Sequence, residues 1–218
     1  MTTRASRFAL PALLLPLLGV YGGWAAITVE DLPDYGVVRQ PLSFTFTVRQ
    51  HGVTKLSNLE PRVEARASGG ATAGAAAERG KDEGQYTARL VLPEAGVWAV
   101  TIHSGFGNSQ VTLEPLQVIE PGSQAPALAV ADRGRRLFVA KGCVTCHLHR
   151  DVSGSGVVAV GPELTSRRLA PEYLQRFLAD PSMIGSANRM PNLNLKQAEI
   201  AALIAFLNGG ERQAGAGN

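Results

Sequence analysis

The most distinctive chemistry in the chain lies in five consecutive residues, Cys143-Val144-Thr145-Cys146-His147. On one turn of helix the two cysteines face the same way, because residues three apart are neighbours on a helix surface. Each thiol can then form a thioether with a vinyl group of a porphyrin, and His147 lies under the iron as its proximal ligand. The spacing therefore predicts one covalently attached haem c (heme c), held by Cys143, Cys146 and His147.

Three other kinds of site use the same residue types. A thioredoxin-like redox pair needs the first turn after a strand in a βαβ unit, whereas the flanks here are helical and loop-like. A zinc site needs a fourth ligand, and the chain has no cysteine beyond these two. A structural disulfide closing so small a loop would remove little chain entropy. Haem attachment is favoured over all three.

Length and charge suggest two domains behind a targeting segment. The chain has 218 residues, enough for one or two domains. Residues 26–126 carry 8 Lys+Arg and 11 Asp+Glu, a net charge of −3, whereas residues 127–218 carry 11 and 7, a net charge of +4. The change of sign supports a boundary near residue 126. The basic half is a solvated surface or a docking face for an acidic redox partner. No nucleic-acid partner is expected, because no sequence motif for binding DNA or RNA accompanies its arginines.

Residues 1–26 have the features of a secretory signal. Two arginines precede an apolar stretch, and small residues follow it, with a cut expected after Ala25 or Ala26. We therefore expect export to the periplasm. The uncharged residues 8–27 are also long enough to span a bilayer as an uncleaved anchor. Two prolines weaken such a helix, so cleavage is favoured over membrane anchorage.

Residues 27–120 show the alternation of half-buried β-strands. The run 43–48 places Phe44, Phe46 and Val48 on one face. Further strands are expected at residues 62–67, 85–92, 96–102 and 111–119, with Pro93-Glu94-Ala95 as a hairpin-like break and Pro115 at an edge or bulge. The Gly/Ala-rich stretch 69–80 is interpreted as a mobile loop. Six or seven short strands in about 100 residues predict an antiparallel sandwich.

Trp98 is the expected core anchor of this sandwich. The pattern Gly84-Gln85-Tyr86…Leu92-Pro93…Gly96-Val97-Trp98 resembles periplasmic immunoglobulin-like domains of the YtkA-like type. Some relatives of such sandwiches bind copper, which makes His51 and His103 candidate ligands. Residues 27–126 contain no cysteine or methionine, the soft ligands that cuprous copper prefers. We therefore expect both histidines to be ordinary surface or strand-end residues.

The period changes to that of helices after a short linker. Residues 121–126, with two prolines and a glycine, block continuation of either a strand or a helix. Helices are then expected at residues 132–141, from Pro171 up to Asp180-Pro181, and at 199–207. In the first of them Leu137 and Phe138 face inward, with Arg133, Arg135 and Arg136 largely outside, while Gly134 allows the last helix to approach closely. Residues 211–218 are expected to form a flexible tail.

This second half contains several motifs, one after another. In chain order they are an opening helix with Gly134 and Phe138, the Cys143–His147 motif, Gly161-Pro162-Glu163-Leu164, a helix with Tyr173-Leu174 and Phe177-Leu178 ending at Asp180-Pro181, Arg189-Met190-Pro191, and a closing helix with Phe206. Over residues 127–210 this order resembles a class I c-type cytochrome. The resemblance implies an all-α cytochrome c fold behind the all-β immunoglobulin-like sandwich.

The resemblance also implies roles for individual residues. The carbonyl of Pro162 would accept the ring N–H of His147, and Met190 would bring its thioether to the other side of the iron. Met183 is the alternative sixth ligand within this domain. In place of a tryptophan, which is absent after Trp98, the haem propionates would meet one of three arginines. These are Arg167, Arg168 and Arg189. In addition, Asn192 or Asn194 could form a hydrogen bond to the sulfur of Met190.

Filling both axial positions with protein side chains leaves electron transfer as the simplest chemistry. We expect a periplasmic mono-haem carrier with a redox protein as donor and another as acceptor, acting alone or as the cytochrome subunit of a larger oxidoreductase complex. The sandwich would serve as a docking or spacing module. Two alternatives remain: a haem sensor, in which Met190 leaves the iron, and a copper-handling protein. An enzyme is not expected, because no nucleophile–base arrangement is present.

Overall fold

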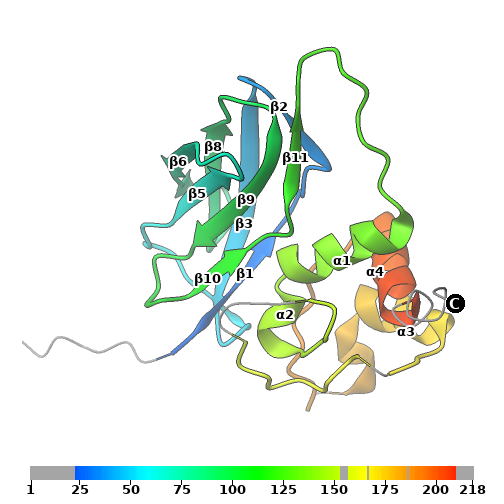
Figure 1. The fold of residues 1–218 in the computed structure, drawn as a ribbon. Helices are drawn as coiled ribbons and strands as arrows, with labels where there is room; N and C mark the ends of the chain where they lie inside the picture. Colours follow the sequence, from blue (N-terminus) through cyan, green and yellow to red (C-terminus); the bar gives the residue numbers. More distant parts are fainter. Residues whose placement is uncertain (1–22, 153–156, 166, 186, 210–218) are drawn as a thin grey trace, which may run out of the picture.

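The protein consists of a β-sandwich followed by a small bundle of helices (Figure 1). The computed structural model describes residues 23–152, 157–165, 167–185 and 187–209. The strands are β1 (Ala25–Val29), β2 (Tyr35–Val37), β3 (Pro41–Gln50), β4 (Thr54–Lys55), β5 (Arg62–Ala67), β6 (Thr72–Ala76), β7 (Glu78–Arg79), β8 (Gln85–Val91), β9 (Gly96–His103), β10 (Gln110–Thr112) and β11 (Leu116–Ile119). The helices are α1 (Val130–Ala140), α2 (Cys143–Cys146), α3 (Pro171–Ala179), the 3₁₀ helix η1 (Pro181–Ile184) and α4 (Gln197–Gly209).

Two sheets pack face to face in the sandwich. One has the strand order β1-β3-β8-β7 with β4 beside β3, and the other has the order β2-β11-β9-β5-β6 with β10 beside β9. Alternation places Phe44 and Phe46 of the first sheet, and Trp98 and Ile102 of the second, in the core between them, where all four are buried. The prediction of an all-β immunoglobulin-like sandwich anchored by Trp98 is confirmed.

Two predictions about the strands are wrong. Residues 93–95 do not close a hairpin, because β8 and β9 belong to opposite sheets and the chain crosses between them. The Gly/Ala-rich stretch 69–80 is no loop: β6 pairs with β5, and β7 pairs with β8. An edge strand needs only backbone hydrogen bonds on one side, so small side chains suffice there.

The first strand begins inside the segment predicted to direct export. β1 starts at Ala25, which pairs with Gln50 of β3, and its five residues are buried. A cut after Ala25 or Ala26 would remove the first pairs of this strand. The rest of the predicted signal or anchor, residues 1–22, lies outside the described residues. None of the described helices is long and apolar enough to cross a membrane.

The helical half is built on a close crossing of α1 and α4. A Cβ atom on Gly134 would overlap the carbonyl oxygen of Ala202, so only glycine lets the two backbones approach as they do. The rings of Phe138 and Phe206 lie beside this point with their centroids 5.6 Å apart. The close approach expected at Gly134 is confirmed.

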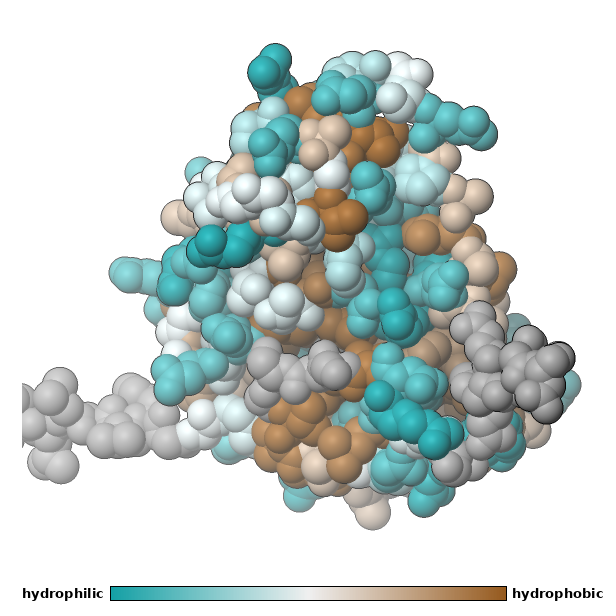
Figure 2. All heavy atoms as spheres, in the orientation of Figure 1, coloured by the Kyte–Doolittle hydropathy of each residue, from teal (hydrophilic) through white to brown (hydrophobic). Residues whose placement is uncertain are grey.

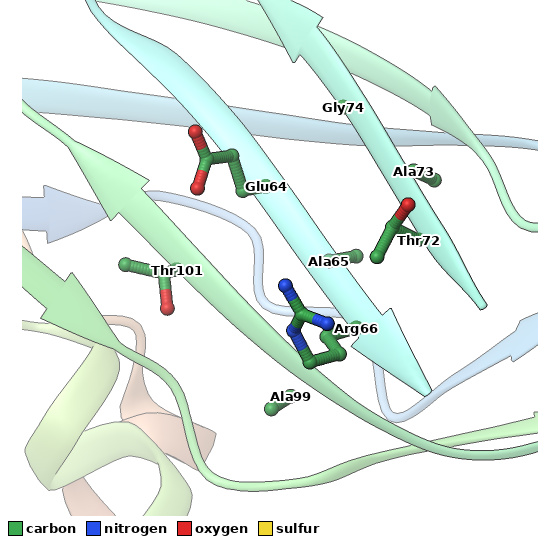
Figure 3. A pocket seen from close by; sticks show the side chains of 8 residues that line it. All are labelled: Glu64, Ala65, Arg66, Thr72, Ala73, Gly74, Ala99 and Thr101. Atoms are coloured by element: carbon green, nitrogen blue, oxygen red, sulfur yellow. The ribbon is translucent and has the colours of Figure 1, made fainter. Parts of the chain in front are cut away.

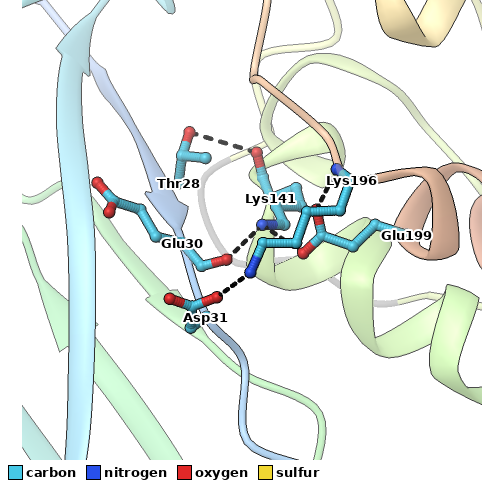
Figure 4. Close-up of polar contacts among 6 residues, drawn as sticks. All are labelled: Thr28, Glu30, Asp31, Lys141, Lys196 and Glu199. Carbon is cyan, nitrogen blue, oxygen red and sulfur yellow. Dashed lines mark hydrogen bonds and ion pairs between the residues drawn. The ribbon is translucent and has the colours of Figure 1, made fainter.

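The two halves are in direct contact through a buried lysine (Figure 4). The Nζ of Lys141 donates to the carbonyl oxygen of Glu30 in the segment after β1 at 2.7 Å and pairs with Oε1 of Glu199 in α4 at 2.8 Å. The side chains of Lys141 and Glu199 are only 4% and 12% exposed. The other carboxylate oxygen of Glu199 accepts the backbone N–H of Lys196 at 2.9 Å and so caps α4. One cation therefore joins the sandwich to both crossing helices.

Arginines of α1 extend the same interface. The guanidinium of Arg136 donates to the carbonyl oxygens of Pro33 at 3.0 Å and Asp34 at 2.8 Å, and Arg133 pairs with the carboxylate of Asp34 at 3.2 Å. The prediction that Arg136 points outward is wrong, because it is buried. The carbonyl groups between β1 and β2 that receive these donors could not be foreseen from the helix itself.

Replacing Gly134 with alanine should disrupt the helix crossing. The added methyl group has no room against Ala202, so we expect the free energy of unfolding to fall by at least about 1–3 kcal/mol. Urea unfolding followed by circular dichroism measures the change. Gly209→Ala is the matched control, because a Cβ there meets nothing within 4 Å. Equal stability of the two variants would contradict the crossing described here.

Removing the amine of Lys141 should strongly weaken the contact between the domains. Lys141→Ala leaves the carboxylate of Glu199 buried without its cation, and such a loss lowers stability by about 3–5 kcal/mol. Lys196→Ala is the control, since the ion pair of Lys196 with Asp31 has side chains 69% and 77% exposed and solvent screens it. We expect no measurable loss from that variant in the same unfolding experiment. A Lys141 variant as stable as the control would show that the buried pair contributes nothing.

Candidate functional site

The helices surround a cavity of about 740 Å³ that also reaches the sandwich. This volume lies within the range of sites for small molecules and cofactors, roughly 300–1,000 Å³. Its lining is mostly apolar, with Phe138, Leu174, Phe177 and Leu203 among the side chains. All five predicted site residues line it: Cys143, Cys146, His147, Pro162 and Met190.

The two cysteines form the ends of α2, a single helical turn. Gly142 precedes this turn with a φ angle of +79°, and a Cβ there would lie 2.7 Å from the carbonyl oxygen of Ile27 in β1. The helix therefore starts where α1 meets the sandwich. The N–H of His147 donates to the carbonyl of Cys143 at 2.9 Å, which places the imidazole directly after the turn.

The environment of the thiols disfavours the competing redox and zinc interpretations. Removal from water raises the pKa of the Cys143 thiol to about 12, and it also raises the pKa of Cys146. A reactive thiol pair needs the opposite shift, because the thiolate is the nucleophile. Within the described residues, no three His, Cys, Asp or Glu side chains gather as a metal cluster. The arrangement suits two neutral thiols that are converted to thioethers.

The imidazole of His147 is oriented by the segment that follows it. Its Nδ1 lies 2.8 Å from the carbonyl oxygen of Pro162, so Nδ1 carries the proton and Nε2 keeps a lone pair for a metal. A Cβ on Gly161 would overlap the ring of His147, and the N–H of Gly161 donates to the carbonyl of Cys146 at 2.8 Å. Gly161 thus lets the backbone press against the imidazole, a role that the sequence analysis did not assign.

Met190 lies at the cavity, whereas Met183 does not line it. Met183 is 44% exposed in η1, and Met190 is half-buried. The backbone N–H of Met190 donates to Oδ1 of Asn188 at 3.2 Å, and Nδ2 of Asn188 donates to the carbonyl of Pro181 at 2.5 Å. Asn188, which the sequence analysis passed over, therefore positions the methionine. Nδ2 of Asn192, proposed to reach the sulfur, instead donates to the carbonyl of Ala179 at 3.3 Å.

Two of the three candidate arginines lie at the cavity. Arg167 and Arg189 line it, and Nε of Arg167 is held by the carbonyl of Glu163 at 3.0 Å. Nη1 of Arg168 reaches instead to the carbonyl of Leu207 at 3.4 Å. Of the three candidates, Arg167 and Arg189 are thus the ones placed to meet the carboxylates of a bound cofactor.

The sandwich supplies part of the same cavity, which sequence reasoning missed entirely. Ala26 and Thr28 of β1, and His51 and Gly52 of the turn after β3, are among its lining residues. Motif spacing along the chain carries no signal for such a contact, because the two segments are about 100 residues apart.

The two histidines considered as copper ligands lie on different sheets. His103 ends β9 in the second sheet and its Nε2 lies 3.2 Å from Oε2 of Glu64, whereas His51 follows β3 in the first sheet. The outer face of β5, β6 and β9 has a second hollow of about 590 Å³ beside Glu64 (Figure 3). Its described lining residues include no histidine, cysteine or methionine. The structure offers no soft ligands for copper there.

The donor set around the larger cavity fits haem c. Two thiols on one turn suit the two vinyl groups, an imidazole with a free Nε2 and a thioether suit the iron, and apolar walls suit the porphyrin. Arg167 and Arg189 suit its propionates.

Comparison with known proteins agrees with this fit. Residues 129–207 match the family model described as cytochrome C oxidase, cbb3-type, subunit III. No curated protein matches the chain. The C-terminal region is therefore a cytochrome c domain, which binds haem c, transfers electrons and has redox partners.

Solved structures resemble parts of the chain only loosely. The Lin-41 filamin domain has a TM-score of 0.37 and 11% identity, covering 44% of this chain and 91% of its own. Domains 1–6 of the surface layer protein SbsC have a TM-score of 0.32 and 20% identity, covering 45% of this chain and 13% of theirs. Domains 4 and 5 of SbsC have a TM-score of 0.30 and 19% identity, covering 43% of this chain and 50% of theirs.

Replacing each of the two methionines in turn with alanine should identify the sixth ligand of the iron. In Met190→Ala we expect the far-red absorption of the ferric protein, which reports a sulfur–iron bond, to disappear. Met183→Ala is the matched control and should retain the band, because that side chain is exposed and outside the cavity lining. Loss of the band in the Met183 variant alone would reassign the ligand.

Proposed function

We propose that this chain is an exported, mono-haem electron carrier of the periplasm, working alone or as the cytochrome subunit of a larger oxidoreductase complex, and not itself an enzyme. The observation that supports it best is the gathering of Cys143, Cys146, His147 and Met190 around one apolar cavity. Two cysteines provide attachment for a single haem. The basic segment and apolar stretch of residues 1–22 support export, and cleavage upstream of β1 would leave the sandwich complete.

Each of the gathered residues has a distinct task. When bound, haem c supplies an iron that cycles between ferrous and ferric states. Cys143 and Cys146 fix the position of the cofactor, and the carbonyl of Pro162 fixes the tautomer and orientation of His147. Asn188 holds the backbone of Met190, whose thioether would bind the iron. Apolar walls exclude water and disfavour the more highly charged state, which raises the reduction potential.

The surface near the cavity suits contact with a redox protein. Exposed apolar side chains gather on the helical half, and Figure 2 shows apolar surface over its lower part. Val160 and Ile184, 67% and 53% exposed, lie directly on the cavity wall. Apolar patches of this kind mark interaction sites on soluble proteins. The net charge of +4 over residues 127–218 favours an acidic partner.

Covalent haem is the property that tests this function. Full-length protein matured in a host with a cytochrome c assembly system should give a periplasmic band with haem peroxidase activity on a denaturing gel. The Cys143→Ala/Cys146→Ala double variant should give none, since no thioether can form. Met183→Ala should stain like the wild type. A colourless wild-type band would overturn the proposal.

A further inference from the structure

The turn between β3 and β4 is a fixed part of the sandwich. The N–H groups of Gly52 and Val53 donate to the carbonyls of Arg49 and Gln50 at 3.2 and 3.0 Å. His51 and Gly52 both have positive φ angles, +50° and +76°. The N–H of His51 also donates to the carbonyl of Trp24 at 3.0 Å. Three hydrogen bonds thus fix the backbone conformation of the turn.

This turn lies directly against the attachment motif. A Cβ atom on Gly52 would lie 3.7 Å from the ring of Trp24 and 4.0 Å from Sγ of Cys146. Gly52 is buried, although His51 and Val53 on either side are exposed. Both His51 and Gly52 line the cavity that holds Cys146 and His147. The sandwich therefore closes the cavity next to its second attachment point.

The contact follows from the interface between the two halves. β1 pairs with β3 up to Gln50, at the start of the turn, and the segment after β1 receives the ammonium of Lys141. Gly142 packs against the backbone of Ile27 in the same strand. Because Lys141 and Gly142 immediately precede Cys143, the elements that place the turn also place α2.

From these contacts we infer that the His51–Gly52 turn of the sandwich belongs to the haem-binding site, where it covers the Cys146 edge of the porphyrin. This inference rests on the proposed function, since it requires a haem in the cavity. The sandwich then acts as a wall of the redox centre, and not as a spacer. It shields one edge from water and leaves the rim at Val160 and Ile184 open to a partner.

The wild-type holoprotein provides the first test. Backbone amide resonances of ¹⁵N-labelled full-length protein are compared between the ferrous and paramagnetic ferric states. Groups near the iron shift with oxidation state, so we expect large shifts for His51 and Gly52. Gly70 and His103, on other turns and strand ends of the same sandwich, should shift little. Shifts of equal size in all four would show that the turn is not at the haem.

A charge placed on the turn provides the second test. Aspartate tolerates positive φ angles, so Gly52→Asp puts a carboxylate beside Cys146 and should favour the ferric state on the order of tenfold, a fall in midpoint potential of about 59 mV. Gly52→Asn adds a side chain of the same shape without the charge and should lower the midpoint potential less. Gly70→Asp is the matched control: Gly70 also has a positive φ angle, +98°, but nothing lies within 4 Å of its Cβ position.

The outcomes separate the inference from the proposed function. Equal midpoint potentials for Gly52→Asp and Gly70→Asp, with haem retained, would overturn the inference alone. Absence of covalent haem from the wild-type protein would overturn the function on which it rests. If Gly52→Asp fails to fold, the resonances of the wild-type protein decide the question.

Discussion

The structure depends on a lysine that is removed from water at the meeting point of its two halves. An ammonium group that is almost fully buried requires compensation, and Lys141 obtains it from the carboxylate of Glu199 and the carbonyl of Glu30. The same carboxylate caps α4 through Lys196. The end of α1, the start of α4 and the sandwich are therefore placed by one charge, two residues before the attachment motif begins.

This interface explains why the sandwich and the helical bundle share a cavity. Donors on α1 meet backbone carbonyls of the segment between β1 and β2, which strand pairing leaves available. Such contacts need charge on one side and only backbone on the other. The connection from β11 to α1 can then run away from the body of the protein (Figure 1), because the domains are held together by direct contact.

Local patterns predicted most elements, and the misses have a common cause. Alternation identified β3, β5, β8 and β9, and Pro171 identified the start of α3, because each signal lies within the element itself. β6 and β7 were missed because these edge strands form through backbone hydrogen bonds to the neighbouring strand, which leave no pattern of large apolar side chains. The crossing between β8 and β9 was missed because a turn sequence does not specify which sheet comes next. The burial of Arg136 depends on Pro33 and Asp34, about 100 residues away.

The attachment site illustrates the same division between local and distant information. Spacing alone identified Cys143, Cys146 and His147, since one turn of chain contains them. Their surroundings come from backbone that approaches closely where glycine omits a side chain, at Gly161 against His147 and at Gly52 beside Cys146. Walls made of hydrogen-bonded backbone are more rigid than walls of mobile side chains, and a rigid site preserves its geometry when the charge on a cofactor changes. Recruiting a turn of the sandwich as such a wall is a physical reason for the two domains to share one chain.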